Sequence, residues 1–188
     1  MTYTMEEKYE SIKRDIREQR SKNPVDVAKA LMKKDYINIH GPEHHFLDGA
    51  ALIIAFRNAG GDIDIDEAFD QLSSRSIKMP PGMCGRWGVC GAVTGVGAAM
   101  AVINSLCHLT NGDMYGENME HTCRAVQKMS TMGGPRCCKR NAYITLTNAV
   151  SFLKEKYGVE LEIEDIICEF TSANPQCIKE RCIYYPVK

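Results

Sequence analysis

The stretch VCGAVTGVGAAMAVINSLCHL, residues 89–109, decides the fold. Its small residues recur three and four positions apart, a spacing that puts side chains on one face of a helix, as at Gly91, Gly95, Ala98 and Ala99. A face without bulky side chains lets a second helix come close. No Asp, Glu, Lys or Arg occurs from residue 87 to 112, but the glycines and the polar Asn104 and His108 argue against a membrane span. We therefore predict a buried helix at the centre of the molecule.

Helical patterns flank this segment on both sides. Asn23-Pro24 and Gly41-Pro42-Glu43 are each typical of a helix start. The helix that carries Phe46 to Phe56 is apolar around most of its circumference and should be buried. Only Val159, Leu161 and Ile163 alternate as in a strand. We predict a mainly α fold, a compact helical bundle around the Gly/Ala-rich helix with a Cys-rich irregular C-terminal tail.

Two parts are expected along the chain. Residues 1–36 should form an N-terminal helical arm, because the helix within residues 5–22 has only a thin apolar stripe among its charges. Residues 37–188 should form the Cys-rich helical domain that carries the metal or redox chemistry. The arm and the small-residue face of the 90–107 helix also favour a homodimer.

The composition narrows the classes of partner and the compartment. The formal net charge of the 188 residues is −1, so the chain has no basic footprint for nucleic acid. Residues 1–20 are charged and lack the apolar segment of a signal peptide, which predicts a cytoplasmic protein without membrane association. Structural disulfides are disfavoured there. The nine cysteines, all between Cys84 and Cys182, therefore indicate metal ligands or redox thiols.

The first cysteine group is Cys84-Gly-Arg-Trp-Gly-Val-Cys90, whose glycines let the backbone curl around a ligand. If the central helix begins near Val89, Cys90 lies in its first turn, where the helix dipole favours thiolate. The alternative is a pair of buried, unreactive cysteines in a tight Gly-rich packing site.

The second group is Gly133-Gly-Pro-Arg-Cys-Cys-Lys-Arg140, just before another amphipathic helix. The helix N-terminus and the cations favour an unusually acidic thiol at Cys137 or Cys138. Adjacent cysteines cannot easily pair with each other in ordinary disulfide geometry. The alternative is a capped helix start with solvent-facing cations, which leaves the two thiols unexplained.

The third group, Cys168, Cys177 and Cys182, lies in a tail with little core of its own, so a metal could hold the tail in place. The alternative is that these cysteines pack as small hydrophobic residues. Cys107 and Cys123 occur within helical patterns beside apolar neighbours, and we expect both to be buried structural residues. Seven cysteines then remain as candidates for chemistry.

The segment His40-Gly-Pro-Glu43-His44-His45 places three of the five histidines beside a carboxylate at a helix start. Imidazole and carboxylate groups suit zinc, iron or a proton shuttle. His44 and His45 point about 100° apart on a helix, so only one of them should face any one site. The alternative is a polar helix start capped by a histidine.

Five segments together resemble an uncharacterised prokaryotic family of cysteine-rich domains, namely HGPEHH (40–45), AFRNAGG (55–61), PGMCGRWGVCGA (81–92), GGPRCCKR (133–140) and NPQCIKERC (174–182). The resemblance covers about residues 38–185. It implies a helical domain with relatives in anaerobes and supplies no reaction. The chain is also distantly similar to the small helical redox-protein family named for its C-GCAxxG-C-C motif, with Cys90-Gly91-Ala92 standing where that motif has Gly-Cys-Ala.

Seven candidate cysteines exceed the four ligands of one tetrahedral zinc ion. They could supply one iron–sulfur cluster with spare thiols, or two metal sites. We expect an iron–sulfur protein that acts in redox or sulfur chemistry, with a 4Fe–4S cluster bound by Cys84, Cys138, Cys177 and Cys182.

The remaining candidates have roles around that cluster. Cys90 or Cys137 would be a free thiolate beside it, and His44 with Glu43 would donate or accept a proton. Arg136 would hold an anionic substrate, such as sulfide or a small thiol. The alternative partner is a redox protein. Two alternatives stay open: a structural zinc ion in a binding or regulatory module, and a metal-free thiol oxidoreductase that cycles Cys84–Cys90 or the Cys137/Cys138 pair.

Overall fold

The structure, a computed structural model, describes residues 3–186. The described residues form only helices and irregular segments and contain no strand, so the prediction of a mainly α fold is confirmed. The elements are α1 (Met5–Ile16), α2 (Pro24–Met32), α3 (Glu43–Asn58), α4 (Ile65–Ser76), α5 (Met83–Trp87), α6 (Gly91–Ile103), α7 (Asp113–Ser130), α8 (Cys138–Tyr157) and the 3₁₀ helix η1 (Lys179–Arg181). Within residues 3–186, no helix combines the length and apolar character needed to cross a bilayer.

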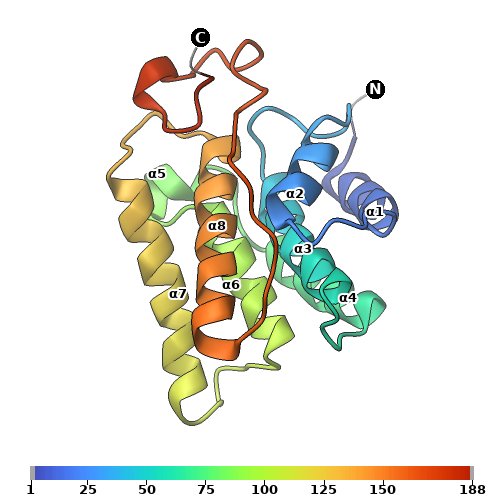
Figure 1. The fold of residues 1–188 in the computed structure, drawn as a ribbon. Coiled ribbons are helices and arrows are strands. Elements are labelled where there is room, and N and C mark those ends of the chain that lie inside the picture. Colours follow the sequence, from blue (N-terminus) through green and yellow to red (C-terminus); the bar gives the residue numbers. More distant parts are fainter. Residues whose placement is uncertain (1–2, 187–188) are drawn as a thin grey trace.

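The centre of the bundle is the pairing of α3 with α6, the most extensive contact between two helices of the described chain (Figure 1). The predicted small-residue face makes this pairing possible. A Cβ on Gly95 would lie 2.0 Å from the backbone oxygen of His45, and a Cβ on Gly49 would lie 2.6 Å from that of Gly95. Both helices are buried along most of their length. The prediction of a buried Gly/Ala-rich central helix is therefore confirmed.

The end of α6 changes the expected place of Cys107. The helix ends at Ile103, and Ser105 then adopts a φ of 52°, in the left-handed region, where the chain turns away. Cys107 is exposed after this turn, and Cys123 is exposed on α7. The prediction that both cysteines are buried is wrong, because α6 stops before Cys107 and α7 buries only His121 and Ala125.

α1 and α2 pack against α3 and belong to the same hydrophobic cluster as the later helices. The apolar stripe of α1 is almost fully buried, at Tyr9, Ile12 and Ile16. Tyr9 stacks on Phe46 of α3 with ring centroids 4.7 Å apart. Residues of the expected arm, 1–36, therefore share one core with residues of the expected domain, 37–188.

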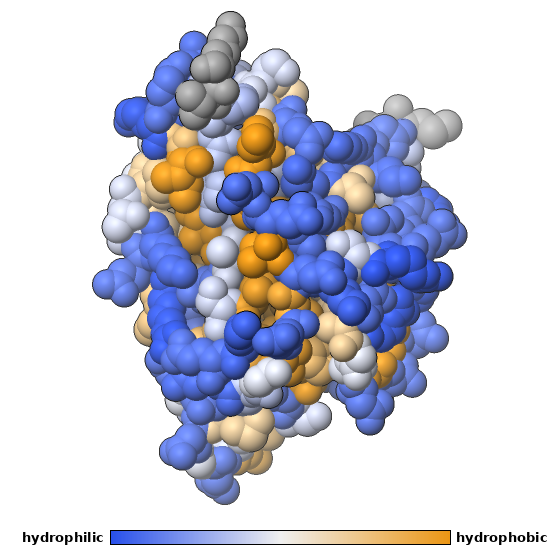
Figure 2. Space-filling view, in the orientation of Figure 1, coloured by the Kyte–Doolittle hydropathy of each residue, from blue (hydrophilic) through white to orange (hydrophobic). Residues whose placement is uncertain are grey.

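After α8 the chain runs back along the bundle without regular structure until η1 (Figure 1). The strand predicted over residues 159–163 is wrong. Val159 and Leu161 pack against the core and Glu160 between them is exposed, but Ile163 is exposed as well, so the alternation does not continue as one buried face. Figure 2 shows apolar side chains gathered along the middle of this face, where the tail crosses α8.

Replacing Gly95 by alanine tests the closeness of α3 and α6. The new Cβ would meet backbone atoms, which cannot move aside as a flexible side chain can. We expect the free energy of unfolding to fall by about 1–3 kcal/mol or more. Gly116→Ala is the matched control, because Gly116 is exposed in α7 with open space around its Cβ. It should gain up to about 1 kcal/mol from helix propensity. Urea titration measures the free energy of unfolding of both variants. A Gly95→Ala variant as stable as the wild type would contradict the packing argument.

A buried histidine makes the stability of the fold depend on pH. His121 in α7 is fully buried against Phe152, and neither ring nitrogen has a hydrogen-bond partner. Burial, reinforced by the charge of Arg124, lowers the pKa of His121 to about 4. The unfolded chain takes up this proton near pH 6.5 and the folded chain only near pH 4. The free energy of unfolding therefore falls as the pH drops through this window, by roughly 1.4 kcal/mol per pH unit at most.

We expect His121→Phe to flatten this pH profile, because phenylalanine fills the same apolar space without a titrating group. The measurement is the urea midpoint at steps from about pH 7 down to pH 4. His108→Gln changes an exposed histidine and should follow the wild type. An unchanged slope in His121→Phe would assign the acid sensitivity to other groups.

Candidate functional site

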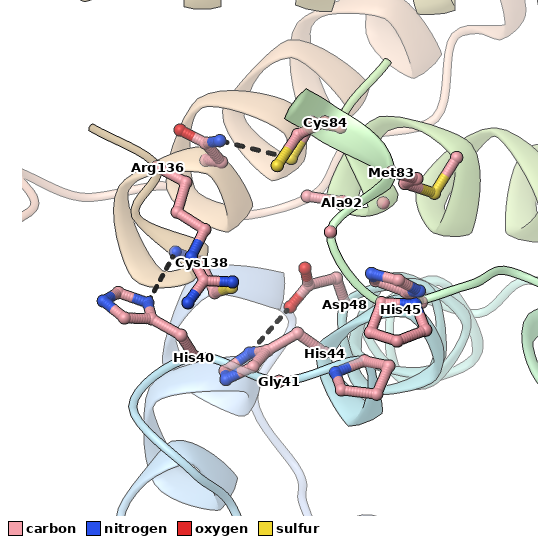
Figure 3. A pocket seen from close by; sticks show the side chains of 16 residues that line it. His40, Gly41, His44, His45, Asp48, Met83, Cys84, Ala92, Arg136 and Cys138 are labelled. Carbon is pink, nitrogen blue, oxygen red and sulfur yellow. Dashed lines mark hydrogen bonds and ion pairs between the residues drawn. The ribbon is translucent and has the colours of Figure 1, made fainter. Parts of the chain in front are cut away.

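A cavity of about 140 Å³ lies where the N-terminal ends of α3, α6 and α8 meet α5 (Figure 3). We name it the thiol cavity. Three helix N-termini give it a positive electrostatic environment. Its wall carries three thiols, three ionisable side chains of α3 and one cation, namely Cys84, Cys90, Cys138, His44, His45, Asp48 and Arg136. The expectation that only one of His44 and His45 faces any one site is therefore wrong.

The close approach of α6 to α3 places Cys90 beside the histidines. Cys90 is the N-cap residue of α6, and a Cβ on the following Gly91 would lie 2.0 Å from the His45 ring. His45 therefore packs into the space that a glycine leaves. The Nδ2 atom of Asn141 donates a hydrogen bond to the Cys90 Sγ at 3.2 Å, which ties α8 to the start of α6.

Four side chains of α3 have buried polar atoms without a hydrogen-bond partner, and one of these atoms is the Oε2 of Glu43. Both carboxylate oxygens of the fully buried Asp48 lack a partner, as do the Nδ1 atoms of His44 and His45. The His44 Nδ1 lies 3.9 Å from the Asp48 Oδ1, and Figure 3 shows the two groups facing each other. Burial raises the pKa of Asp48 and lowers the pKa of His45. Buried polar groups without partners are rare in native proteins, and those of His44, His45 and Asp48 line a cavity, where they are available to a ligand.

A buried lysine lies behind His44. The Lys139 Nζ is 3.0 Å from the His44 Nε2 and donates to the Asn38 backbone oxygen at 2.9 Å. Burial lowers the pKa of Lys139 to about 8. The alternative in which the cations at the start of α8 face solvent is wrong for Lys139 and Arg140, because both are buried.

Burial also decides the protonation of two cavity thiols. It raises the pKa of Cys90, and it raises the pKa of Cys138 to about 12. The helix start therefore does not make Cys90 acidic, and of the pair Cys137/Cys138 it is not Cys138 that is acidic, because desolvation outweighs the helix dipole and the nearby cations. Coordination to a metal would reverse the effect of burial on these thiols, since a coordinating thiol is deprotonated outright.

The adjacent Cys137 and Cys138 face different cavities. Cys138 lines the thiol cavity, whereas Cys137, the N-cap residue of α8, lines a second cavity of about 20 Å³ with Cys168, Cys177 and Cys182. We name this second space the tail cavity. The expected ligands Cys84, Cys138, Cys177 and Cys182 are thus divided between two cavities. As placed, no three His, Cys, Asp or Glu side chains of residues 3–186 converge on a position suited to one metal ion.

Glu43 supports the wall of the thiol cavity and does not line it. Its buried Oε1 accepts hydrogen bonds from the Lys8 Nζ at 3.1 Å and from the Asn38 N–H at 2.8 Å. These contacts hold the segment before α3 in place. The carboxylate that faces His44 is that of Asp48.

The sequence interpretation missed Asp48 and Lys139. A signal for Asp48 exists: it is a carboxylate within an otherwise apolar run, four residues after His44, which puts both on one helix face. Lys139 gives no such signal, because a lysine beside an arginine is typical of a solvated surface.

The Lys8–Glu43 pair provides a test of this support. Both side chains are buried, so Lys8→Met leaves a buried carboxylate without its cation. We expect the free energy of unfolding to fall by about 3 kcal/mol. Lys154→Met, which removes an exposed pair with Glu160, should cost less than about 1 kcal/mol. The measurement is urea unfolding of both variants, and equally small losses would show that Glu43 does not depend on Lys8.

A family model described as a family of unknown function (DUF5714) matches residues 12–185. No curated protein and no solved structure matches the chain. The expected membership of an uncharacterised family is confirmed, and the match begins within α1 rather than near residue 38. The similarity to the C-GCAxxG-C-C family stays a prediction.

Proposed function

Since the chain belongs to this family of unknown function, DUF5714, its activity must follow from its own site, and we propose that the thiol cavity binds an iron–sulfur cluster used in redox or sulfur chemistry. Cys84, Cys90 and Cys138 would hold the cluster. This set replaces the two expected tail ligands by Cys90. One observation carries the proposal: α5, α6 and α8 each bring one thiol to a single cavity whose wall holds a buried carboxylate without a partner.

The size of the thiol cavity suits a cluster better than a single ion. Its volume of about 140 Å³ is roughly ten times the 10–15 Å³ that one water molecule needs on this measure. The cavity offers three thiols, one fewer than the four cysteines of an all-thiolate zinc site. Iron–sulfur clusters are bound by Cys thiolates, and three helix N-termini with Arg136 offset the negative charge.

Burial argues against the metal-free thiol oxidoreductase at this place. The raised pKa values of Cys90 and Cys138 leave little thiolate near neutral pH, and thiolate is the form that attacks. Ligation to iron removes this obstacle. The reducing cytoplasm that the sequence predicts would keep the thiols available.

The remaining groups would serve the chemistry at the cluster. His44 and Asp48 face each other and would move a proton, with Lys139 hydrogen-bonded behind the imidazole. His45 or Asp48 would stand at the fourth coordination position, which has no cysteine. When bound, the cluster supplies one-electron transfer or an iron site for a sulfur ligand.

Access to this site would come from an outer groove of about 340 Å³. The groove shares Cys84, Cys90 and Arg136 with the thiol cavity. Arg136 would hold an anionic substrate there, such as sulfide or a small thiol. The same opening would serve electron exchange with a redox partner protein.

The test is the iron and acid-labile sulfide content of protein prepared without oxygen, together with its visible absorbance. We expect the wild type to be coloured and to contain iron and sulfide in about equal amounts. Cys138→Ser and Cys84→Ser should lose most of both, because each removes one of only three cysteine ligands. Cys123→Ser, which changes an exposed cysteine on α7, is the control and should keep both.

Circular dichroism separates loss of the cluster from loss of the fold. Helical content should match the wild type in both variants. Colourless wild-type protein without iron would overturn the proposal. If that protein also contained fast-reacting thiols at Cys84 and Cys90, the oxidoreductase would replace it.

A further inference from the structure

The C-terminal segment is ordered with little regular structure to hold it. Between Gly158 and Pro186 the only helix is η1. The buried side chains of this C-terminal segment are few, namely Phe170, Asn174 and Ile178. A segment with so small a core usually needs another constraint, such as a disulfide or a metal ion.

The tail cavity brings four cysteines to the point where this segment meets α8. Cys137 comes from the start of α8, and Cys168, Cys177 and Cys182 come from the segment itself. All nine cysteines of the chain are free thiols. The volume of about 20 Å³ holds one water-sized occupant and leaves no room for a cluster.

Two of these sulfurs, those of Cys137 and Cys177, accept hydrogen bonds from N–H groups. The Cys137 Sγ accepts from the Arg140 N–H at 3.5 Å and from the Asn174 Nδ2 at 3.6 Å. The Cys177 Sγ accepts from the Lys179 N–H at 3.4 Å. Such donors stabilise thiolate and recur around metal-bound cysteines. They are an observation independent of the cysteine count.

We propose that Cys137, Cys168, Cys177 and Cys182 bind one zinc ion that fastens the C-terminal segment to the start of α8. Four thiolates are a common tetrahedral ligand set for structural zinc. The side chains do not yet converge on one point, so binding requires them to turn inward. They can do so because they lie in irregular backbone or at a helix cap, outside the rigid turns of α8.

Charge around the tail cavity favours this ion. Zinc with four thiolates carries two net negative charges, and the buried Lys139 and Arg140 both line the cavity. Lys139 also reaches His44 beside the thiol cavity. In addition, the His40 Nε2 lies 3.0 Å from the Asn174 Oδ1, and the Cys138 N–H donates to the His40 Nδ1 at 3.4 Å. The zinc ion would thus hold the segment that braces one wall of the thiol cavity.

The test measures zinc and iron separately in the full-length protein, prepared without oxygen and without chelators. We expect about one zinc ion per chain in the wild type. Cys182→Ser and Cys168→Ser should bring zinc near zero and leave helical content unchanged. Cys84→Ser is the matched control, because it changes a cysteine of the other cavity and should keep its zinc.

Two further measurements guard against folding artefacts and distinguish this site from the thiol cavity. Reduced, metal-free protein titrated with Co²⁺ should show thiolate-to-cobalt charge-transfer absorbance, which Cys182→Ser should lose. Limited proteolysis should cut the segment after residue 168 faster in Cys182→Ser than in the wild type. Zinc retained at the wild-type level in Cys182→Ser would overturn the proposal, as would wild-type protein that binds neither Zn²⁺ nor Co²⁺. Loss of iron in Cys182→Ser with retention in Cys84→Ser would place iron in the tail cavity and overturn the zinc assignment.

Discussion

The closeness of α3 and α6 is the constraint on which the rest of the structure depends. The two backbones touch at Gly95 and His45, where even a methyl group has no room. The same contact brings Gly91 under the His45 ring and so places Cys90 beside the ionisable face of α3. The same close contact between α3 and α6 therefore packs the core and assembles the thiol cavity. The core and the candidate site cannot vary independently.

A second feature follows from burying so many ionisable groups at one end of the bundle. Glu43 is compensated by Lys8 and by the Asn38 N–H, and Lys139 is hydrogen-bonded to Asn38 and His44. Asp48 differs in degree: both of its oxygens lack a hydrogen-bond partner, whereas Glu43 lacks one only at Oε2, and the nearest cationic candidate is the His44 Nδ1 at 3.9 Å. Desolvating a carboxylate is costly unless a cation or hydrogen-bond donors compensate. Asp48 is therefore the least compensated carboxylate at this end of the bundle, and it lines the thiol cavity.

The start of α8 is the junction between the two cysteine cavities. Cys137 stands outside the helix as its N-cap and Cys138 is its first residue, so their side chains diverge. One short segment thereby contributes a thiol to each cavity, while Lys139 and Arg140 supply buried positive charge close by. Under the two proposals above, this division assigns the cysteines of the two cavities to two separate metal sites.

The sequence alone determined the helical class, the central Gly/Ala-rich helix, most helix starts and the segments that line the two cysteine cavities, because periodicity, caps and breakers are local properties of the chain. It failed where local pattern and packing diverge, at the exposed Cys107 and Cys123, the extended segment 159–163 and the buried Lys139. Which cysteines share a cavity, and which thiols burial keeps protonated, were decided only by the tertiary structure. Both depend on distances and desolvation between segments far apart in the chain, and no spacing along the sequence encodes those quantities.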